Sequence, residues 1–215
     1  MRVLVACEYS GRVRDAFRAL GHDAMSCDFL PTEVEGPHHQ GDVTELLHMG
    51  WDLMIAHPPC THLAVSGSRW FKDKVREQSE ALIFVQTLLD APIPRIALEN
   101  PISVISTRIR KPDQIIQPWM FGEDASKKTC LWLKGLPLLT PTEIIEGTLY
   151  CCGHSLDDKY GCPNCGASKK AKRIYGNQTP SGQNKLGPSE TRWKERSRTY
   201  QGIATAMAQQ WGSLA

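Results

Sequence analysis

Residues 53–60, Leu-Met-Ile-Ala-His-Pro-Pro-Cys, run from a short apolar segment into a proline turn that ends in a cysteine. A second apolar segment, Arg95 to Leu98, runs in the same way into Glu99-Asn100-Pro101. Short apolar runs bounded by turn residues are typical of buried strands in parallel sheets. We therefore expect two such strands, with Cys60 and Glu99 at the carboxyl edge where open α/β sheets bind their ligands.

The chain on either side of this pair alternates between strand-like and helix-like patterns. Apolar and β-branched runs indicate strands, whereas apolar residues spaced three and four apart indicate helices. The expected strands are residues 3–6, 23–27, 51–56, 93–98, 114–118 and 129–133, and the expected helices are residues 11–20, 44–49 and 77–90. This alternation predicts an α/β fold with a doubly wound, mostly parallel sheet.

Length and composition are those of a globular protein, with 215 residues, 41% hydrophobic and 22% charged. We expect an α/β catalytic core over residues 1–137, a small zinc-binding and basic recognition insertion over 138–189, and a C-terminal segment, 190–215, that returns to the core. No apolar run approaches the roughly 20 residues that cross a bilayer, and Met1 leads directly into an expected strand. These features predict a cytoplasmic protein without a membrane segment.

Positive charge is concentrated in one part of the chain. The formal net charge is +2, but residues 166–200 hold nine Lys and Arg against two Glu, a local net charge of +7. A basic segment beside a near-neutral body is typical of proteins that bind polyanions, although it can also be a solvated loop. The candidate phosphate-binding residues are Arg69, Lys72, Lys128, Lys169, Lys170, Lys172, Arg173, Lys185, Arg196 and Arg198.

Four of the eight cysteines crowd into residues 151–165, while the others are scattered along apolar segments. This distribution favours a metal site in a reducing compartment over a disulfide framework. The spacing of the pairs is that of a four-coordinate structural zinc site. The expected ligands are Cys151, His154, Cys162 and Cys165, with Cys152 as the rival of either of the first two; unligated or redox-active cysteine pairs are the alternative.

The Cys60 thiol and the Glu99 carboxyl group suggest chemistry on a pyrimidine ring. A thiol can add to an electron-poor carbon, and a nearby carboxyl group can protonate the ring nitrogen that gains charge. A thiol with its ordinary pKa needs a neighbouring cation, for which His57 and Arg69 are candidates. The alternatives are a buried structural cysteine and a loop histidine, and Asn100 is expected to shape the Cys60 loop by hydrogen bonding.

The loop after the first expected strand, Glu8-Tyr9-Ser10-Gly11, and the acids Asp28 and Asp42 fall at the same expected edge of the sheet. In nucleotide-binding α/β folds, the first loop approaches the ligand and an acid after the second strand binds the ribose hydroxyls. These residues are therefore candidates for a nucleotide cofactor. For Asp42, a helix N-cap is an equally good interpretation, with Thr44 as a rival cap.

The order of these motifs resembles the DNA (cytosine-5) methyltransferase family. His57-Pro58-Pro59-Cys60-Thr61 resembles the family's Pro-Cys nucleophile loop, and Glu99-Asn100-Pro101 resembles its Glu-Asn-Val motif. Ser126-Lys127-Lys128-Thr129 is similar in position to its Gln-Arg-x-Arg motif, and 200–204 to its C-terminal segment. The chain departs from the family at the glycine-rich first loop, where only Gly11 is retained, and at the arginine pair, which is replaced by lysines.

The resemblance implies a Rossmann-like fold and methyl transfer from S-adenosyl-L-methionine to carbon 5 of cytosine in DNA. It implies catalytic roles for Cys60, Glu99, Asn100 and Lys127. It also implies a cofactor site formed by Glu8, Tyr9, Ser10, Gly11, Asp28, Asp42, His57 and Pro58, and a compact chain of the phage or prophage type. The alternatives are the same chemistry on RNA or a cytosine nucleotide, and a non-catalytic nucleic-acid-binding protein on a decayed methyltransferase fold.

Overall fold

The computed structural model describes residues 1–151, 154–155 and 171–214. Within them, a seven-stranded sheet runs in the order β3-β2-β1-β4-β5-β7-β6, in which β7 is antiparallel to both β5 and β6 and the other pairs are parallel. Its strands are β1 (Arg2–Ala6), β2 (Asp23–Asp28), β3 (His38–Gln40), β4 (Leu53–Ala56), β5 (Arg95–Pro101), β6 (Gln114–Ile116) and β7 (Thr129–Lys134). The expected α/β class with a doubly wound, mostly parallel sheet is confirmed.

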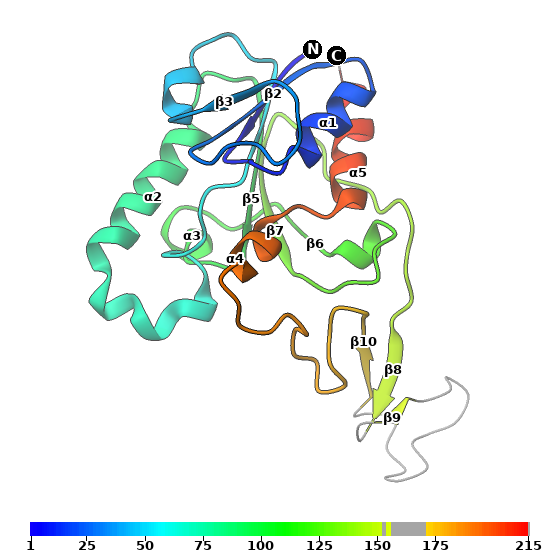
Figure 1. The fold of residues 1–215 in the computed structure, drawn as a ribbon. Coiled ribbons are helices and arrows are strands. Elements are labelled where there is room, and N and C mark those ends of the chain that lie inside the picture. Colours follow the sequence, from blue (N-terminus) through cyan, green and yellow to red (C-terminus); the bar gives the residue numbers. More distant parts are fainter. Residues whose placement is uncertain (152–153, 156–170, 215) are drawn as a thin grey trace.

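Helices cover both faces of this sheet (Figure 1). One face packs against α1 (Arg12–Ala19) and α5 (Gln201–Gly212), which bury Phe17 and Trp211. The other face packs against η1 (Val43–Leu46), α2 (Val75–Leu89) and α3 (Ile105–Arg108). The side chains of β1 and β4 alternate between the two cores because successive residues of a strand point to opposite faces. Both faces are therefore buried, which explains the continuous apolar runs in the sequence.

Two 3₁₀ segments, a small second sheet and one more helix complete the described part of the chain. Two short 3₁₀ segments, η2 (Val65–Asp73) and η3 (Pro118–Met120), lie in the connections that follow β4 and β6. Strands β8 (Thr148–Cys151), β9 (His154–Ser155) and β10 (Lys172–Ile174) form a separate small sheet. The chain then passes through α4 (Arg192–Ser197) and reaches α5, which lies beside α1 (Figure 1). The C-terminal segment thus returns to the core.

The register of the central strands aligns their carboxyl ends. Ala56, the last residue of β4, pairs with Ala6 of β1 and with Leu98 of β5. His57 therefore follows β4 at the level of Glu99, the next residue of β5. This alignment places the loops after β1, β4 and β5 next to one another at one edge of the sheet.

The buried Arg14 of α1 holds the loop between β2 and β3 against the sheet. Its side chain is 0% exposed and donates hydrogen bonds to Ser26 Oγ, Thr32 Oγ1 and the carbonyl oxygens of Val34 and Glu35. A buried guanidinium is tolerated only when its donors are satisfied, so these bonds fix the path of the loop. The loop in turn carries Glu33, which contacts the C-terminal segment.

Candidate active site

The Cys60 loop is fastened to both neighbouring strands. The backbone N–H of His57 donates to Ala6 O at 2.9 Å, and Asn100 Nδ2 donates to Pro58 O at 2.9 Å. Beyond the two prolines, the N–H groups of Leu63 and Ala64 both donate to Cys60 O. The buried Asn100 side chain therefore ties the turn after β4 to the end of β5 and fixes where the Cys60 backbone lies.

Glu99 and His57 form a buried pair at this edge. His57 Nδ1 lies 3.1 Å from Glu99 Oε2, and the two side chains are only 8% and 13% exposed. Burial by itself raises the pKa of Glu99, but hydrogen bonds from His57 and Thr129 and the positive charge of Lys127 outweigh it, so the net pKa is lowered. Glu99 is therefore a carboxylate at neutral pH.

Cys60 is exposed, yet its surroundings do not activate its thiol. Partial desolvation and the negative charge of Glu99 raise its pKa, while Lys127 and Arg196 act in the opposite direction and only reduce the shift. The thiol is therefore mostly protonated at neutral pH. Because the thiolate is the nucleophile, a reaction through Cys60 needs a base for this proton.

Lys127 enters this site from the connection that leads into β7. Its Nζ donates to Arg196 O of α4 at 3.0 Å. Ser126, the residue before Lys127, is held by the Asn177 side chain. Asn177 Oδ1 accepts from Ser126 N at 2.9 Å, and Asn177 Nδ2 donates to Ser126 O at 3.0 Å. The structure thus brings Cys60, Glu99, Asn100, Lys127 and His57 to one edge of the sheet and adds Arg196; the catalytic roles of these residues stay predictions.

The polar side chains of the loop after β1 form hydrogen bonds to other groups of the protein. The Glu8 carboxylate is buried and accepts from the N–H groups of Val13 and Arg14 at 2.7 and 3.2 Å, so it caps the first turn of α1. Ser10 Oγ donates to the same carboxylate at 3.1 Å. The Tyr9 hydroxyl donates to Lys194 O of α4 at 2.8 Å. A direct role of these side chains in cofactor binding stays a prediction.

Two acids and an exposed aromatic ring lie along the edge next to this loop. Asp28 Oδ1 accepts from Leu30 N at 2.9 Å, and Asp42 Oδ1 accepts from Thr44 N at 2.9 Å as the N-cap of η1. Burial is the main cause that raises the pKa of Cys7, and both acids raise it further, so their charges converge on the end of β1. Phe29, which the sequence analysis did not single out, is 73% exposed beside Asp28. The signal in the sequence that could have indicated Phe29 is its position directly after the candidate acid Asp28.

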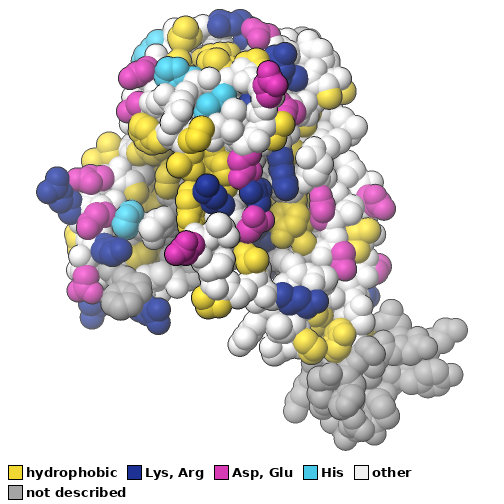
Figure 2. Space-filling view, in the orientation of Figure 1, with side chains coloured by type: hydrophobic (Ala, Val, Ile, Leu, Met, Phe, Trp, Pro, Cys, Tyr) yellow, Lys and Arg dark blue, Asp and Glu magenta, His cyan; other side chains and the backbone are white. Residues whose placement is uncertain are grey.

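Helix α4 crosses the carboxyl edge and is fixed there by an ion pair. Arg198 donates through Nε to Glu33 Oε2 at 2.8 Å and through a terminal nitrogen to Oε1 at 2.6 Å, and it also pairs with Glu195. Arg12 donates to Thr199 O at 2.9 Å. Figure 2 shows Lys, Arg and acidic side chains beside an apolar patch in the middle of this face, where Figure 1 places α4.

Replacing Glu33 by Gln should destabilise the protein by about 1 kcal/mol at pH 7. The hydrogen bond from Arg198 is the main cause that lowers the pKa of Glu33. A lowered folded-state pKa contributes stability that is complete above the unfolded value of about 4.3 and is lost as pH falls through the folded value. The difference in unfolding free energy between wild type and Glu33→Gln should therefore shrink between pH 5 and 3.

Denaturant titrations at several pH values measure this difference. The matched control is Glu35→Gln, an exposed acid on the same loop. A difference for Glu33→Gln that is independent of pH, or that is equalled by the control, contradicts the role assigned to the ion pair.

The candidate phosphate-binding residues are dispersed over the surface. Arg69 and Lys72 lie on η2, Lys128 precedes β7, and Lys172 lies on β10. Arg173 pairs with Glu146 at 2.7 Å, and Lys185 donates to Gly176 O at 2.8 Å. Arg198 is held by Glu33 and Glu195, whereas Arg196 is exposed near Cys60. Lys169 and Lys170 lie outside the described residues.

Half of the expected zinc ligands can be placed. Cys162 and Cys165, and the rival Cys152, lie outside the described residues. Cys151 is buried at the end of β8 and pairs in register with His154 of β9. The described residues contain no group of three potential ligands. The zinc site stays a prediction, and the metal content of the purified protein tests it.

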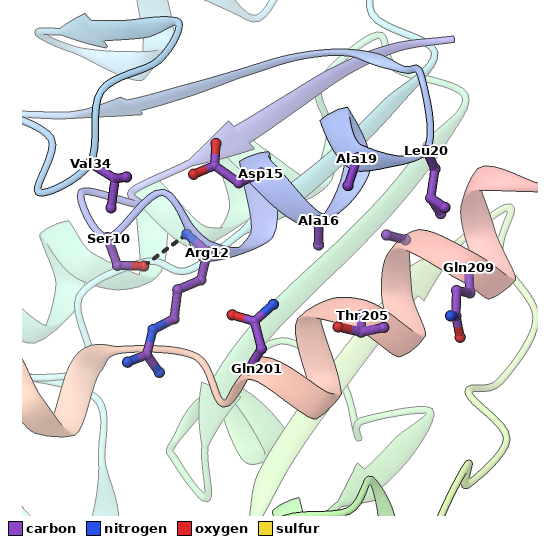
Figure 3. A pocket seen from close by; sticks show the side chains of 11 residues that line it. Ser10, Arg12, Asp15, Ala16, Ala19, Leu20, Val34, Gln201, Thr205 and Gln209 are labelled. Carbon is purple, nitrogen blue, oxygen red and sulfur yellow. Dashed lines mark hydrogen bonds between the residues drawn. The ribbon is translucent and has the colours of Figure 1, made fainter.

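A groove lies on a different part of the molecule, between α1 and α5 (Figure 3). Arg12, Asp15 and Leu20 line one side of it, and Gln201 and Gln209 line the other. Neither Cys60 nor Glu99 lines this groove. It touches the first loop only through Ser10, so it is separate from the candidate active site.

No protein-family profile and no curated protein matches the chain. Among solved structures, the chain is similar to a protein assigned as a DNA modification methyltransferase encoded within a prophage of E. coli, with 14% sequence identity and a TM-score of 0.47. The match covers 75% of this chain and 57% of that protein, so the chain spans little more than half of its length. Among the described residues, no helix is long and apolar enough to cross a membrane.

Proposed function

We propose that this protein transfers a methyl group from S-adenosyl-L-methionine to carbon 5 of cytosine in DNA, through a covalent adduct with Cys60. The observation that supports this most directly is the arrangement at the ends of β4 and β5. An exposed thiol and a buried carboxylate emerge from adjacent parallel strands, and the Asn100 side chain fastens the two strand ends together. Ligands of open α/β sheets bind at this edge.

Each residue has a defined task in this proposal. Cys60 attacks carbon 6 of the ring, and Glu99 supplies a proton or hydrogen bond at nitrogen 3, where negative charge develops. The attack makes carbon 5 nucleophilic, and loss of its proton after methylation expels the thiol. Lys127 offsets negative charge at both Cys60 and Glu99, in agreement with its effect on the pKa values of both groups. Asn100 holds the loop.

The residues next to β1 and β2 fit the proposed cofactor. S-adenosyl-L-methionine, when bound, supplies an electrophilic methyl group on a sulfonium. Asp28 and Asp42 provide an acidic edge suited to ribose hydroxyls and to a cationic group, and Phe29 offers an apolar face for an adenine ring. His57 and Pro58 lie between this edge and Cys60. The Glu8 cap removes two N–H groups of α1 from use by a ligand, so Asp28 and Phe29 become the main expected contacts.

DNA is the proposed substrate because the candidate site is accompanied by dispersed basic residues. A cytosine inside a duplex cannot reach Cys60, so the base has to be flipped out at a cost of roughly a few kcal/mol. Arg69, Lys72 and Lys128 are the proposed phosphate contacts closest in sequence to the reacting groups, and Lys172 and Arg196 extend them. Arg198 and Arg173 are less available because each forms an ion pair within the protein.

The test is mass spectrometry of nucleosides from cytosine-containing duplex DNA, RNA and dCTP, each incubated with the protein and S-adenosyl-L-methionine. We expect 5-methylcytosine in the DNA sample and none when the cofactor is omitted. Product only in RNA or dCTP would keep the chemistry and change the substrate class. No product in any sample, with DNA bound and the cofactor not bound, would replace the enzyme by a nucleic-acid-binding protein.

A further inference from the structure

The two reacting groups of the site have the opposite protonation states from those that a thiolate attack requires. The Cys60 thiol keeps its proton, and Glu99 is already a carboxylate. An attack on the ring therefore needs an acceptor for the thiol proton and a donor at nitrogen 3. Both needs can be met by one group, if that group lies near both atoms.

Glu99 is the candidate for this group, because the register of β4 and β5 and the bond from Asn100 to Pro58 O place the Cys60 turn beside it, and because it keeps unused acceptor capacity. His57 occupies one oxygen, Oε2, at 3.1 Å. A carboxylate has about four acceptor positions, so the bonds from His57 and Thr129 leave room for a further hydrogen bond. The buried position of the pair keeps these hydrogen bonds strong and keeps competing water away.

We propose that His57 is a positioning residue that holds Glu99 as a carboxylate, so that Glu99 takes the Cys60 thiol proton and delivers it to nitrogen 3 of cytosine. This inference rests on the proposed function. The Cys60 S–H bond breaks as the bond between sulfur and carbon 6 forms. The displaced π electrons move to nitrogen 3, which takes the proton from the Glu99 carboxyl group. Glu99 ends the step as the carboxylate that began it, and no further reactant is consumed.

The two nitrogens of the buried His57 ring lie in different surroundings. Its Nδ1 serves Glu99, while its Nε2 is buried and has no hydrogen-bond partner among the described residues. The groups that face the pair from the surrounding elements are Cys60, Lys127 and Thr129, together with Cys130 of β7, whose pKa is raised by burial and by Glu99.

The decisive comparison is between His57→Leu and His57→Asn. Leucine removes the hydrogen bond, so burial dominates and Glu99 ionises at higher pH. Asparagine places its Nδ2 close to the position of His57 Nδ1 and retains a donor. We expect the acid limb of the single-turnover methylation rate to move up by about one pH unit or more in His57→Leu and to remain in place in His57→Asn.

A second readout is independent of methylation. Glutamate labelled with ¹³C at the carboxyl carbon reports the titration of Glu99, assigned by its absence in Glu99→Gln. We expect the Glu99 signal to titrate at lower pH than an ordinary glutamate in wild type and His57→Asn, and at higher pH than an ordinary glutamate in His57→Leu. Thermal unfolding of all variants identifies any that fail to fold.

The two proposals fail in different ways. If wild type methylates cytosine but the acid limb and the Glu99 titration are the same in His57→Leu, the inference is overturned and the proposed function stands. If the Glu99 titration shifts as expected but no cytosine substrate is methylated, the coupling of His57 to Glu99 stands and the proposed function fails. A limb that shifts equally in both variants also overturns the inference, because it shows an effect of altered packing.

Discussion

Cys60→Ala should reduce formation of 5-methylcytosine by at least about 10⁴-fold, to the level of a sample without protein. Alanine leaves no atom that can bond to carbon 6, so the ring carbon to be methylated is never made nucleophilic. The loop itself should survive, because the contacts that hold it come from the backbone at residue 60 and from Asn100. Nucleoside mass spectrometry after incubation with DNA and S-adenosyl-L-methionine measures the loss.

The matched control is Cys27→Ala. Cys27 is the second-last residue of β2, it is buried, and its Sγ donates to Gly41 O. We expect this control to remain active within about threefold. With DNA containing 5-fluorocytosine, wild type and the control should form an adduct that survives denaturation, and Cys60→Ala should not. Product from Cys60→Ala at a rate near that of wild type would exclude the covalent route.

The sequence was sufficient to predict the central strands of the sheet. The expected strands at 3–6, 23–27, 51–56 and 93–98 overlap β1, β2, β4 and β5, because strands buried on both faces carry continuous apolar runs. Strand β3 was missed, since His38–Gln40 is a polar edge strand of three residues within a segment rich in turn residues. Edge strands need not carry an apolar pattern, so their sequences resemble loops.

For the candidate site, the sequence indicated which residues gather but not how they interact. Cys60 and Glu99 were placed at one edge from strand order alone. The hydrogen bond between His57 and Glu99 depends on the register of β4 against β5, and the approach of Arg196 depends on how α4 crosses the edge. Both are tertiary features that join residues far apart in the chain. The sequence analysis also did not predict that Glu8 caps α1. Glu8 lies five residues before Val13, whose N–H it accepts, and this spacing matches no helix-capping pattern in the sequence.

Glu99→Gln should lower the methylation rate by about 10²- to 10⁴-fold while leaving DNA and cofactor binding within a few-fold of wild type. Glutamine is nearly isosteric and its amide oxygen can still accept from His57 Nδ1, so the arrangement of β4 and β5 should persist. The amide cannot take or deliver the proton that the addition step requires. Single-turnover kinetics and equilibrium binding, measured on the same preparation, separate the two effects.

The same substitution should make the Cys60 thiol more reactive toward a simple alkylating agent. The negative charge of Glu99 is one of the causes that raise the pKa of Cys60, whereas Lys127 and Arg196 lower it. Removing that charge leaves burial as the cause that opposes the two cations, so the thiol pKa falls and more thiolate is present at pH 8. Peptide mass spectrometry after brief treatment with iodoacetamide measures alkylation at Cys60 alone, and Glu77→Gln, on the exposed side of α2, is the control.

Loss of the Glu99 charge should speed alkylation whatever Glu99 does at the ring, because it acts on the thiol pKa alone. Faster alkylation therefore shows that the Cys60 loop is intact and its thiol accessible, whereas a disturbed loop would slow both reactions or neither. Slower methylation by a variant whose thiol is more reactive then places the defect at the ring, where Glu99 is proposed to act on nitrogen 3.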